Sequence, residues 1–375
     1  MNKIYVSAGA VLAASVAGAA WLMNANPSAQ STDDAYVEGN IIQVTPQVGG
    51  SVTMIAADNT DFVKAGEPLL RLNDVDAQLA VSRAEAQLSR AVRQVRVQFA
   101  NATQGKANVT LRATDLARVQ ADLARRRQLA SSGAVSGEDV HHAEDAVKAA
   151  QAALDVAQQQ LASSQALVDK TTISDHPDVQ AAISQLRDAY VAANRTTVRA
   201  PASGYVSKRN VQIGQRINAG SAVMSIVPPD QMWVNANFKE SQLRQIHIGQ
   251  PVQLVADVYG KSVRYTGRVI GQEAGTGSAF SLLPAQNASG NWIKVIQRVP
   301  VRIALDPKEL AAHPLKLGLS MHVEVDTSQP GNPSVKAANT AYSTDVFEHE
   351  MQDADAAVAR IIAANVGAGQ LAKVN

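Results

Sequence analysis

The sequence contains no cysteine, which excludes thiolate metal sites, a disulfide framework and a lipid-anchored N-terminal cysteine. Aromatic residues make up only 4% of the 375 residues, although hydrophobic residues reach 46%. Such a composition favours long alanine-rich helices and valine-rich strands over one large aromatic core. An excess of one charge is also lacking, because 34 basic and 33 acidic residues give a net charge of +1. The charge balance therefore gives no electrostatic case for nucleic-acid binding.

Sequence motifs of catalysis are missing as well. The sequence has no Gly-x-Ser-x-Gly elbow, no phosphate-binding loop and no Rossmann fingerprint. Among the seven histidines, only His141 and His142 form a cluster, together with Glu144. A histidine and a carboxylate three residues apart share a helix face, but no third ligand follows at a site-forming spacing. We therefore expect no enzyme activity, no metal and no cofactor.

The N-terminus carries the longest apolar run. Ile4–Met23 are 20 uncharged, mostly apolar residues, and about 20 helical residues at ~1.5 Å each span the ~30 Å hydrocarbon core of a bilayer. Lys3 precedes the run and acidic residues follow it, so the positive-inside rule places the bulk of the chain outside the cytoplasm. A cleaved signal peptide is the alternative to an anchor, because the run is rich in alanine. Both interpretations place residues 30–375 in the periplasm of a double-membrane bacterium.

An internal repeat flanks a long insertion. Each copy, at 48–73 and 197–228, has the pattern of strand, glycine turn, strand, Ala-Gly turn and strand, with alternating apolar residues. One copy has too little core to fold alone, so the two copies are predicted to face each other as a small β-sandwich. This arrangement makes residues near 75 and 197 neighbours in space.

The insertion, residues 74–196, is predicted to be a long α-helical hairpin. Residues 74–130 contain no proline and a single glycine. In the second arm, large and small residues follow a heptad seam that lets two helices approach closely. The large seam residues are Val140, Val147, Leu154, Leu161 and Val168, and the small ones are Ala143, Ala150, Ala157 and Ser164.

The two arms of the insertion match in length, so they are expected to fold back on each other with a tip at 130–138. At ~1.5 Å per residue each arm is about 85 Å long. A joint in the second arm is expected at Thr171–Pro177. There, Pro177 is predicted to be the first helical residue after a Ser174/Asp175 cap.

Strand patterns replace helical ones after residue 228. Alternating polar and apolar residues predict strands at 232–238, 251–259, 263–271 and 292–305. These strands indicate a small β-barrel, and a last strand pair is expected at Val299–Leu305 and Met321–Asp326. A short terminal helix is expected at Val346–Ala364.

Two stretches carry a resemblance to a known family. They are Met-Trp-Val-Asn-Ala-Asn-Phe-Lys-Glu at residues 232–240 and the run 275–287, which continues to Arg302. With the split repeat, the hairpin and the N-terminal apolar run, they resemble the HlyD-type membrane fusion proteins, most closely the EmrA branch, over about residues 30–326. The resemblance implies an α+β multidomain fold. A split lipoyl-like β-sandwich with an inserted long antiparallel α-helical coiled-coil hairpin is followed by a β-barrel and a membrane-proximal β-domain, and is preceded by an N-terminal transmembrane helix.

This architecture gives an expected division of the chain. It comprises an N-terminal membrane anchor (1–29), a first membrane-proximal strand (30–47), lipoyl-like half 1 (48–73), the hairpin (74–196), lipoyl-like half 2 (197–228), the β-barrel (229–298), a membrane-proximal β-domain (299–328) and a C-terminal tail (329–375). A carrier function would need a lysine at the exposed turn of the lipoyl-like domain. Lys64 is in such a position, but Asn218 takes the matching position of the second half, so we expect no carrier.

The resemblance implies a periplasmic adaptor of a tripartite multidrug efflux pump, held in the bacterial inner membrane by a single pass. Such an adaptor links an inner-membrane major-facilitator drug/proton antiporter to a TolC-like outer-membrane channel. Copies of the adaptor associate into a ring or tube, and hydrophobic drugs are further candidate ligands. An adaptor for aromatic-acid efflux or for type I protein secretion would share the fold, and a structural protein of the cell envelope is a more remote alternative.

The resemblance also points to residues at the tip. Adaptors that dock on TolC-like channels share an Arg-x3-Leu-x6-Ser pattern there, and Arg125, Leu129 and Ser136 have this spacing. The arginine can donate to carbonyls at helix ends of the channel, the leucine can fill a groove between helices, and the serine can cap the second arm and reach a backbone group. The alternative is a solvated arginine, a leucine of the seam and a serine that is only a cap.

A long Gly/Ser/Asn-rich loop at 275–291 is expected inside the barrel, and long loops are uncommon without a role. Phe280, Leu282 and Leu283 would be exposed apolar groups on it. We predict that they contact the transporter or line the exit path. The alternative is that the two leucines tuck into the barrel.

Overall fold

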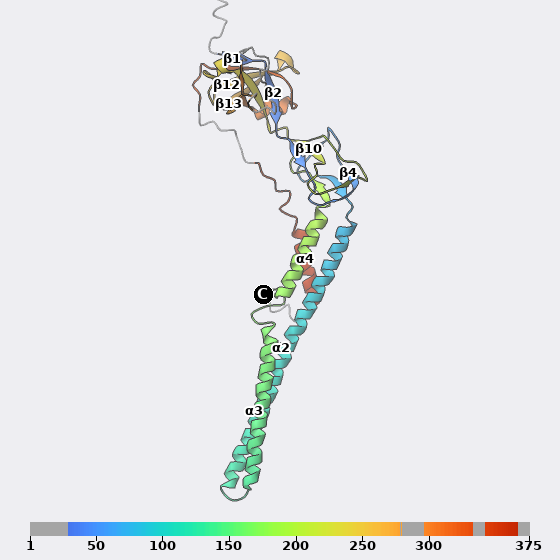
Figure 1. Ribbon diagram of the computed structural model, residues 1–375, viewed down its shortest axis with the longest axis vertical. Helices are drawn as coiled ribbons and strands as arrows, with labels where there is room; N and C mark the ends of the chain where they lie inside the picture. The colour runs from blue at the N-terminus through green and yellow to red at the C-terminus, as the bar shows by residue number, and fades with distance from the viewer. Residues whose placement is uncertain (1–28, 278, 280–295, 333–341, 367–375) are drawn as a thin grey trace, which may run out of the picture.

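The computed structural model describes residues 29–277, 279, 296–332 and 342–366. They form an elongated molecule with a β-sheet domain at one end, a β-sandwich next to it and a long helical hairpin that ends in a tip (Figure 1). Within this described part, no helix is long and apolar enough to cross a membrane. The run Ile4–Met23, for which the anchor is predicted, lies outside the described residues.

The β-sandwich is built from both copies of the internal repeat. The first copy and the chain before it supply β3 (Ile42–Val44), β4 (Gly50–Ile55), β5 (Phe62–Val63) and β6 (Pro68–Leu72), and the second supplies β7 (Thr197–Arg199), β8 (Gly204–Ser207), β9 (Arg216–Ile217) and β10 (Met224–Val227). Its two sheets have the orders β3-β10-β8-β5 and β7-β6-β4-β9, so each mixes the copies around one aliphatic core. The amide of Leu72 donates to the carbonyl of Thr196 at 2.8 Å, which confirms that the ends of the insertion are neighbours. Gly66 and Gly220 have φ of 82° and 80°, the left-handed conformation that glycine adopts without strain at such turns.

The insertion forms the predicted hairpin. α2 (Val75–Ala130) runs unbroken for 56 residues, about 84 Å, and the chain returns through α3 (Gly137–Ala166) and α4 (Pro177–Asn194). The heptad seam of α3 faces α2, and Ala143, Leu154 and Ala157 are buried there. The arms lie close together at Gly105 of α2, where an added Cβ would lie 3.2 Å from the Cδ1 atom and 3.4 Å from the Cα atom of Leu161 in α3, so the site favours glycine.

The joint of the second arm differs from the prediction in its cap. Pro177 is the first residue of α4, as expected, but the cap is His176 and not Ser174 or Asp175. The Nδ1 atom of His176 accepts from the amide of Asp178 at 3.2 Å, and its Nε2 atom lies 3.0 Å from the C-cap carbonyl oxygen of α3. The buried imidazole therefore joins both broken ends of the arm, which neither shorter side chain is placed to do.

The root of the hairpin is a bundle of three helices. α7 (Gln352–Val366) lies along α2 and α4 (Figure 1). Val358 and Ile361 of α7 belong to the same buried cluster as Leu88 of α2 and Leu186 of α4. The sequence analysis assigns residues 329–375 to a tail, but the last described part of that tail completes the core of the hairpin.

One seven-stranded sheet forms the domain at the other end. It consists of β1 (Ala29–Thr32), β2 (Ala35–Gly39), β11 (Met232–Lys239), β12 (Pro251–Ala256), β13 (Tyr265–Gln272), β14 (Arg298–Leu305) and β15 (Met321–Asp326), in the order β1-β15-β12-β13-β14-β11-β2. The connecting helices are α5 (Glu240–Leu243), η1 (Gly260–Ser262) and α6 (Pro307–Ala312). Phe238, Tyr265 and Ile303 are fully buried in a single core. The sheet curls until β2 meets the start of β15, where the amide of Val37 donates to the carbonyl of Leu319 at 2.9 Å, so it is barrel-like.

Three boundary predictions for this region are wrong. The expected barrel (229–298) and membrane-proximal domain (299–328) are one sheet with one core, because β14 lies between β13 and β11. β14 and β15 do not pair, since α6 and the turn after it carry the chain past β13 and β12 before β15 begins. The expected single strand at 30–47 is divided: β1 and β2 join the seven-stranded sheet, and β3 joins the sandwich.

Candidate functional site

The hairpin tip is the turn 131–136 between α2 and α3. The last carbonyls of a helix have no partner within the helix. Here the hydroxyls of Ser131 and Ser132 donate to the carbonyls of Gln128 at 2.6 Å and Leu129 at 2.7 Å. Gly133 then reverses the chain with a φ of 74°. Serines and one glycine thus close the turn, and its two apolar residues are Ala134, which is exposed, and Val135, which is half-buried.

A capping box begins the second arm. The Oγ atom of Ser136 accepts from the amide of Asp139 at 3.2 Å, and the carboxylate of Asp139 accepts in return from the amide of Ser136 at 3.3 Å. These hydrogen bonds satisfy amide groups that a helix start leaves free. The hydroxyl of Ser136 also donates to the carboxylate of Asp139 at 2.5 Å. This bond, together with the one from the Ser136 amide, holds the pKa of the Asp139 carboxyl below its ordinary value, because the ionised form is the better acceptor.

Ion pairs surround the turn. Asp122 binds Arg126 at 2.8 Å and Arg125 at 3.2 Å along α2, and these two guanidinium groups lower the pKa of its carboxyl. Arg127 crosses to α3 and binds Glu144 at 2.6 Å, which lowers the pKa of that carboxyl too. The Arg127–Glu144 pair is the contact that the sequence analysis missed. Because the arms have equal lengths, the two residues lie at about the same distance from the turn. Opposite charges at such matching positions of a hairpin predict an ion pair between its arms.

The three residues predicted for docking lie together at the tip but differ in state. The side chain of Arg125 is 69% exposed, although one nitrogen contacts Asp122. Leu129 is 49% exposed, so it is not a member of the buried seam. Ser136 is exposed, but its hydroxyl donates to the carboxylate of Asp139 and accepts from the amide of the same residue. The arrangement therefore presents an apolar group and a cation, while the serine shapes the turn.

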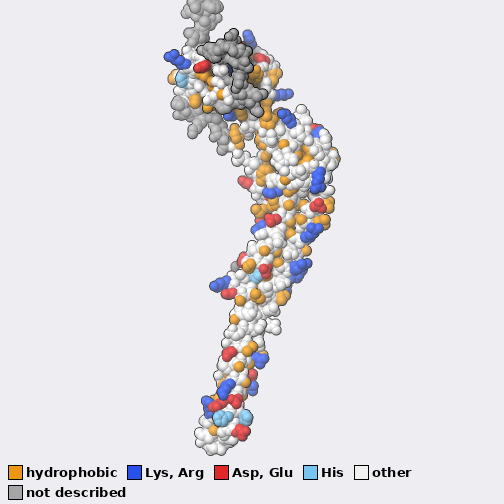
Figure 2. Space-filling model, in the orientation of Figure 1, with side chains coloured by type: hydrophobic (Ala, Val, Ile, Leu, Met, Phe, Trp, Pro, Cys, Tyr) orange, Lys and Arg blue, Asp and Glu red, His pale blue; other side chains and the backbone are white. Residues whose placement is uncertain are grey.

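Charged and histidine side chains gather over the tip (Figure 2). His141 lies 3.5 Å from Glu144 and His142 lies 3.7 Å from Glu138, which makes two separate pairs. No three histidine, aspartate or glutamate side chains in the described part of the chain are grouped so that they could hold a metal ion.

The other residues predicted for binding cannot be placed. Phe280, Leu282 and Leu283 lie outside the described residues. Their contact with a transporter or an exit path stays a prediction.

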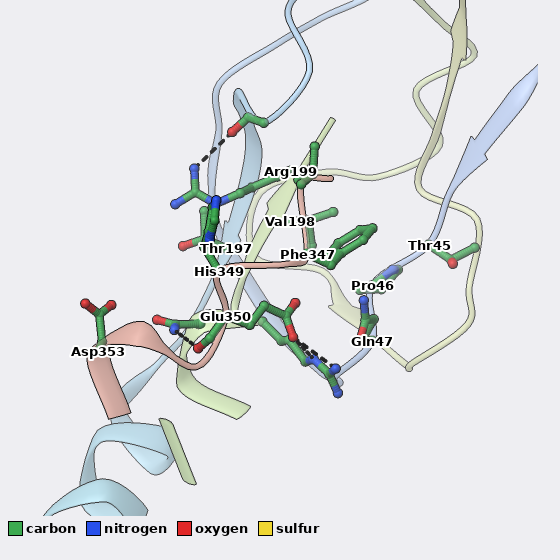
Figure 3. A pocket seen from close by; sticks show the side chains of 14 residues that line it. Thr45, Pro46, Gln47, Thr197, Val198, Arg199, Phe347, His349, Glu350 and Asp353 are labelled. Atoms are coloured by element: carbon green, nitrogen blue, oxygen red, sulfur yellow. Dashed lines mark hydrogen bonds and ion pairs between the residues drawn. The ribbon is translucent and has the colours of Figure 1, made fainter. Parts of the chain in front are cut away.

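A hollow lies at the root of the hairpin, far from the tip (Figure 1). It has a volume of about 350 Å³ and is lined by the sandwich, by the end of α4 and by the segment before α7. Phe347 of that segment lies opposite Pro46 and Val198 of the sandwich (Figure 3). Among the residues that line the hollow, Glu350 forms an ion pair with Arg195 at 3.0 Å. The sequence analysis did not find this hollow, because nothing local to residues 342–351 says which surface they cover.

Known proteins resemble this chain over most of its length. Residues 75–196 match the family model described as EMRA, alpha-helical hairpin domain. Fatty acid resistance protein FarA from Neisseria gonorrhoeae is 53% identical over 311 residues, which cover 83% of this chain and 79% of that protein. Multidrug export protein EmrA from Escherichia coli K12 is 50% identical over 299 residues, covering 80% and 77%. The protein of the same name from Haemophilus influenzae is 43% identical over 339 residues, covering 90% and 87%.

Proposed function

Because the chain belongs to the EmrA family of membrane fusion adaptor proteins, we propose that it is the periplasmic adaptor of a tripartite efflux pump. Members of this family are adaptors and not enzymes, which confirms the expectation that the chain catalyses no reaction. Its work is mechanical and geometric. It holds a transporter and an outer channel in line and encloses the path between them.

The exposed Leu129 at the far end of the hairpin carries this proposal. Leu129 lies in the last turn of α2 and is half-exposed, next to a turn whose apolar residues are Ala134, which is exposed, and Val135, which is half-buried. Exposed apolar groups framed by polar ones mark protein contacts. A helical hairpin tip with one such leucine fits a groove between helices of a channel, and Arg125 beside it suits the carbonyls at helix ends.

The proposed orientation follows from the two ends of the molecule. The sheet domain begins at Ala29, the last residue of the range 1–29 for which the anchor is predicted, so this domain lies at the inner membrane. The tip lies at the opposite end (Figure 1). In this orientation the sheet domain meets an inner-membrane major-facilitator antiporter, and the tip meets a TolC-like outer-membrane channel. One thin hairpin cannot enclose a path, so several copies associate into a ring or tube.

The tip contact is tested by cross-linking. The chain has no cysteine, so Leu129→Cys introduces a unique reactive group. In cells that express the channel with an engineered cysteine at its periplasmic helix ends, Leu129→Cys is expected to form a cross-link. The control is Leu111→Cys, since Leu111 is 63% exposed on α2 but lies away from the tip. Equal cross-linking from both positions, or from neither, would contradict docking through the tip.

The cargo has two candidate classes. Relatives of this chain are named for multidrug export, and the relative that is 53% identical is named for fatty acid resistance. We propose hydrophobic drugs as the cargo, with fatty acids as the second candidate. Deletion of the gene, with and without complementation, followed by growth on hydrophobic drugs and on long-chain fatty acids separates the two. Unchanged sensitivity to both classes would count against an efflux role.

The loop residues give a separate proposal for the inner-membrane side. Replacement of Phe280 and Leu283 by serine is expected to reduce resistance while expression and assembly stay unchanged, because these side chains are proposed to contact the transporter or line the exit path. Unaltered resistance would refute this role and leave the tip proposal intact.

A further inference from the structure

The hairpin is joined to the sandwich by little covalent structure. The chain crosses between them twice, once before α2 and once after α4. Beside these crossings lies the hollow of about 350 Å³. Two bodies joined by short connections with a gap beside them are expected to move relative to each other unless a further contact fixes them.

Residues 342–366 lie next to both bodies, because their first part lines this hollow together with the sandwich and α7 packs on the hairpin root. On the sandwich side, Phe347 faces Pro46 and Val198 across the hollow (Figure 3). At the end of α4, the carboxylate of Glu350 binds Arg195 at 3.0 Å, and the backbone carbonyl of Glu350 accepts from the side chain of Asn194 at 3.0 Å.

α7 continues this contact along the hairpin root. Val358 and Ile361 are buried against α2 and α4. Two ion pairs flank them, one to each helix of the hairpin. Asp355 binds Arg187 of α4 at 2.8 Å, and Arg360 binds Glu85 of α2 at 3.0 Å.

The contact ends where the second arm is broken. Near the end of α7, the side-chain oxygen of Asn365 accepts from Arg93 at 2.8 Å, and its backbone carbonyl accepts from Arg96 at 2.9 Å. Val366 is buried in the cluster to which Ile173, a residue of the joint between α3 and α4, also belongs. The segment thus spans the whole root, from the sandwich to the joint.

We propose that residues 342–366 act as a splint that fixes the hairpin root to the lipoyl-like sandwich. Apolar burial supplies the attachment, and ion pairs of opposite polarity to the two arms set the position of α7 along the root. Beyond the joint, α2 and α3 form a hairpin of two helices, whereas α7 packs on α2 and α4 at the root. The splint therefore sets the angle at which the outer hairpin leaves the body. The consequence that this angle aligns the tip for a channel rests on the proposed function, but the splint itself does not.

Distance measurements on the purified full-length protein test the splint. Spin labels at Ala222→Cys in the sandwich and Gln94→Cys in α2 report the angle of the root, and the native chain has no cysteine to interfere. Ile361→Asp places a charge in the buried face of α7 and is expected to broaden the distance distribution. The matched control Ala359→Asp adds the same charge on the exposed face and is expected to leave it narrow. Equal distributions in the two variants, or a broad one in the parent protein, would overturn the proposal.

Exchanging the charges of an ion pair distinguishes loss of the splint contact from unfolding of the hairpin root. Glu350→Arg opposes Arg195 and is expected to broaden the distribution, and the double variant with Arg195→Glu is expected to narrow it again. Failure of the second change to restore the narrow distribution would contradict the splint. These measurements need no channel or transporter. A failure of tip docking with an intact splint would therefore sink the proposed function and leave this inference standing.

Discussion

Leu129→Ser is the sharpest test of the tip as a docking surface. The leucine is 49% exposed, so about half of its surface remains to be buried by a partner. Full burial of a leucine contributes about 1.5–3 kcal/mol, so the exposed half is worth about 1 kcal/mol, or roughly five-fold in the Kd of one tip. In the proposed assembly several tips engage one channel at once, and the losses multiply through the avidity of the ring.

The assay is binding of the purified adaptor to an immobilised TolC-like channel, followed by surface plasmon resonance. Growth on hydrophobic drugs gives the matching readout in cells. Leu111→Ser is the control, because it makes the same change at an exposed position of α2 away from the tip. Both variants are expected to melt with the parent protein in circular dichroism, since neither residue is part of the buried seam.

The outcome that refutes the reasoning is equal behaviour of the two variants. If Leu129→Ser and Leu111→Ser bind the channel alike, the exposure of Leu129 is incidental. If both lose affinity, the outer surface of the hairpin contributes generally and the tip has no special place.

Three further predictions concern stability and protonation. Ser136→Ala removes the capping box and costs about 1 kcal/mol at the start of α3, so the amide of Asp139 is expected to exchange faster, whereas Ser136→Asp keeps a cap and is expected to preserve protection. Leu186→Ala empties a fully buried position of the root and is expected to cost about 2–5 kcal/mol in urea unfolding; a cost below that of an exposed-site control such as Leu167→Ala would contradict the packing. Because Arg127 lowers the pKa of Glu144 in the folded state, the pair stabilises the tip fully above the ordinary value of 4.5 and is lost as pH falls through the lowered pKa. The carboxyl resonance of Glu144 should titrate below 4.5 and move up in Arg127→Gln, and a midpoint at or above 4.5 in the parent protein would refute the pairing.

Local patterns were sufficient to predict the hairpin and the sandwich. The heptad seam of the second arm and the unbroken first arm need only helical periodicity, and the pairing of the repeats follows from what one copy lacks. The joint shows the limit of this reasoning. Ser174 and Asp175 are the residue types that cap helices in isolation, but a buried His176 reaches both ends of the break, which is visible only in three dimensions.

Contacts between elements that are far apart in the chain could not be predicted from the sequence. Val358 and Ile361 predict an apolar helix face, but not that it covers α2 and α4, because Leu88 and Leu186 already had each other as partners in the hairpin. For the same reason the merger of two expected β-domains into one sheet was missed. At the tip, the resemblance to channel-docking adaptors pointed to Leu129. It did not decide whether this leucine is buried in the seam or exposed, because the helix ends there and no further turn continues the seam.

The position of β1 has a consequence for how the protein is made. β1 pairs only with β15 in the sheet, with Ala29 opposite Asp326, so the first strand of the sheet has no partner until the last one is present. Pairings of such sequence separation form slowly, whereas the helices of the hairpin need only near neighbours. The sandwich and the outer hairpin of α2 and α3 can therefore form early, while the seven-stranded sheet waits for β15 and the hairpin root waits for α7. A chain cut short before β15 keeps the outer hairpin but lacks α7, and it leaves the edges of β1 and β12 open. Open strand edges invite pairing with other chains, so such a chain is expected to aggregate through this sheet.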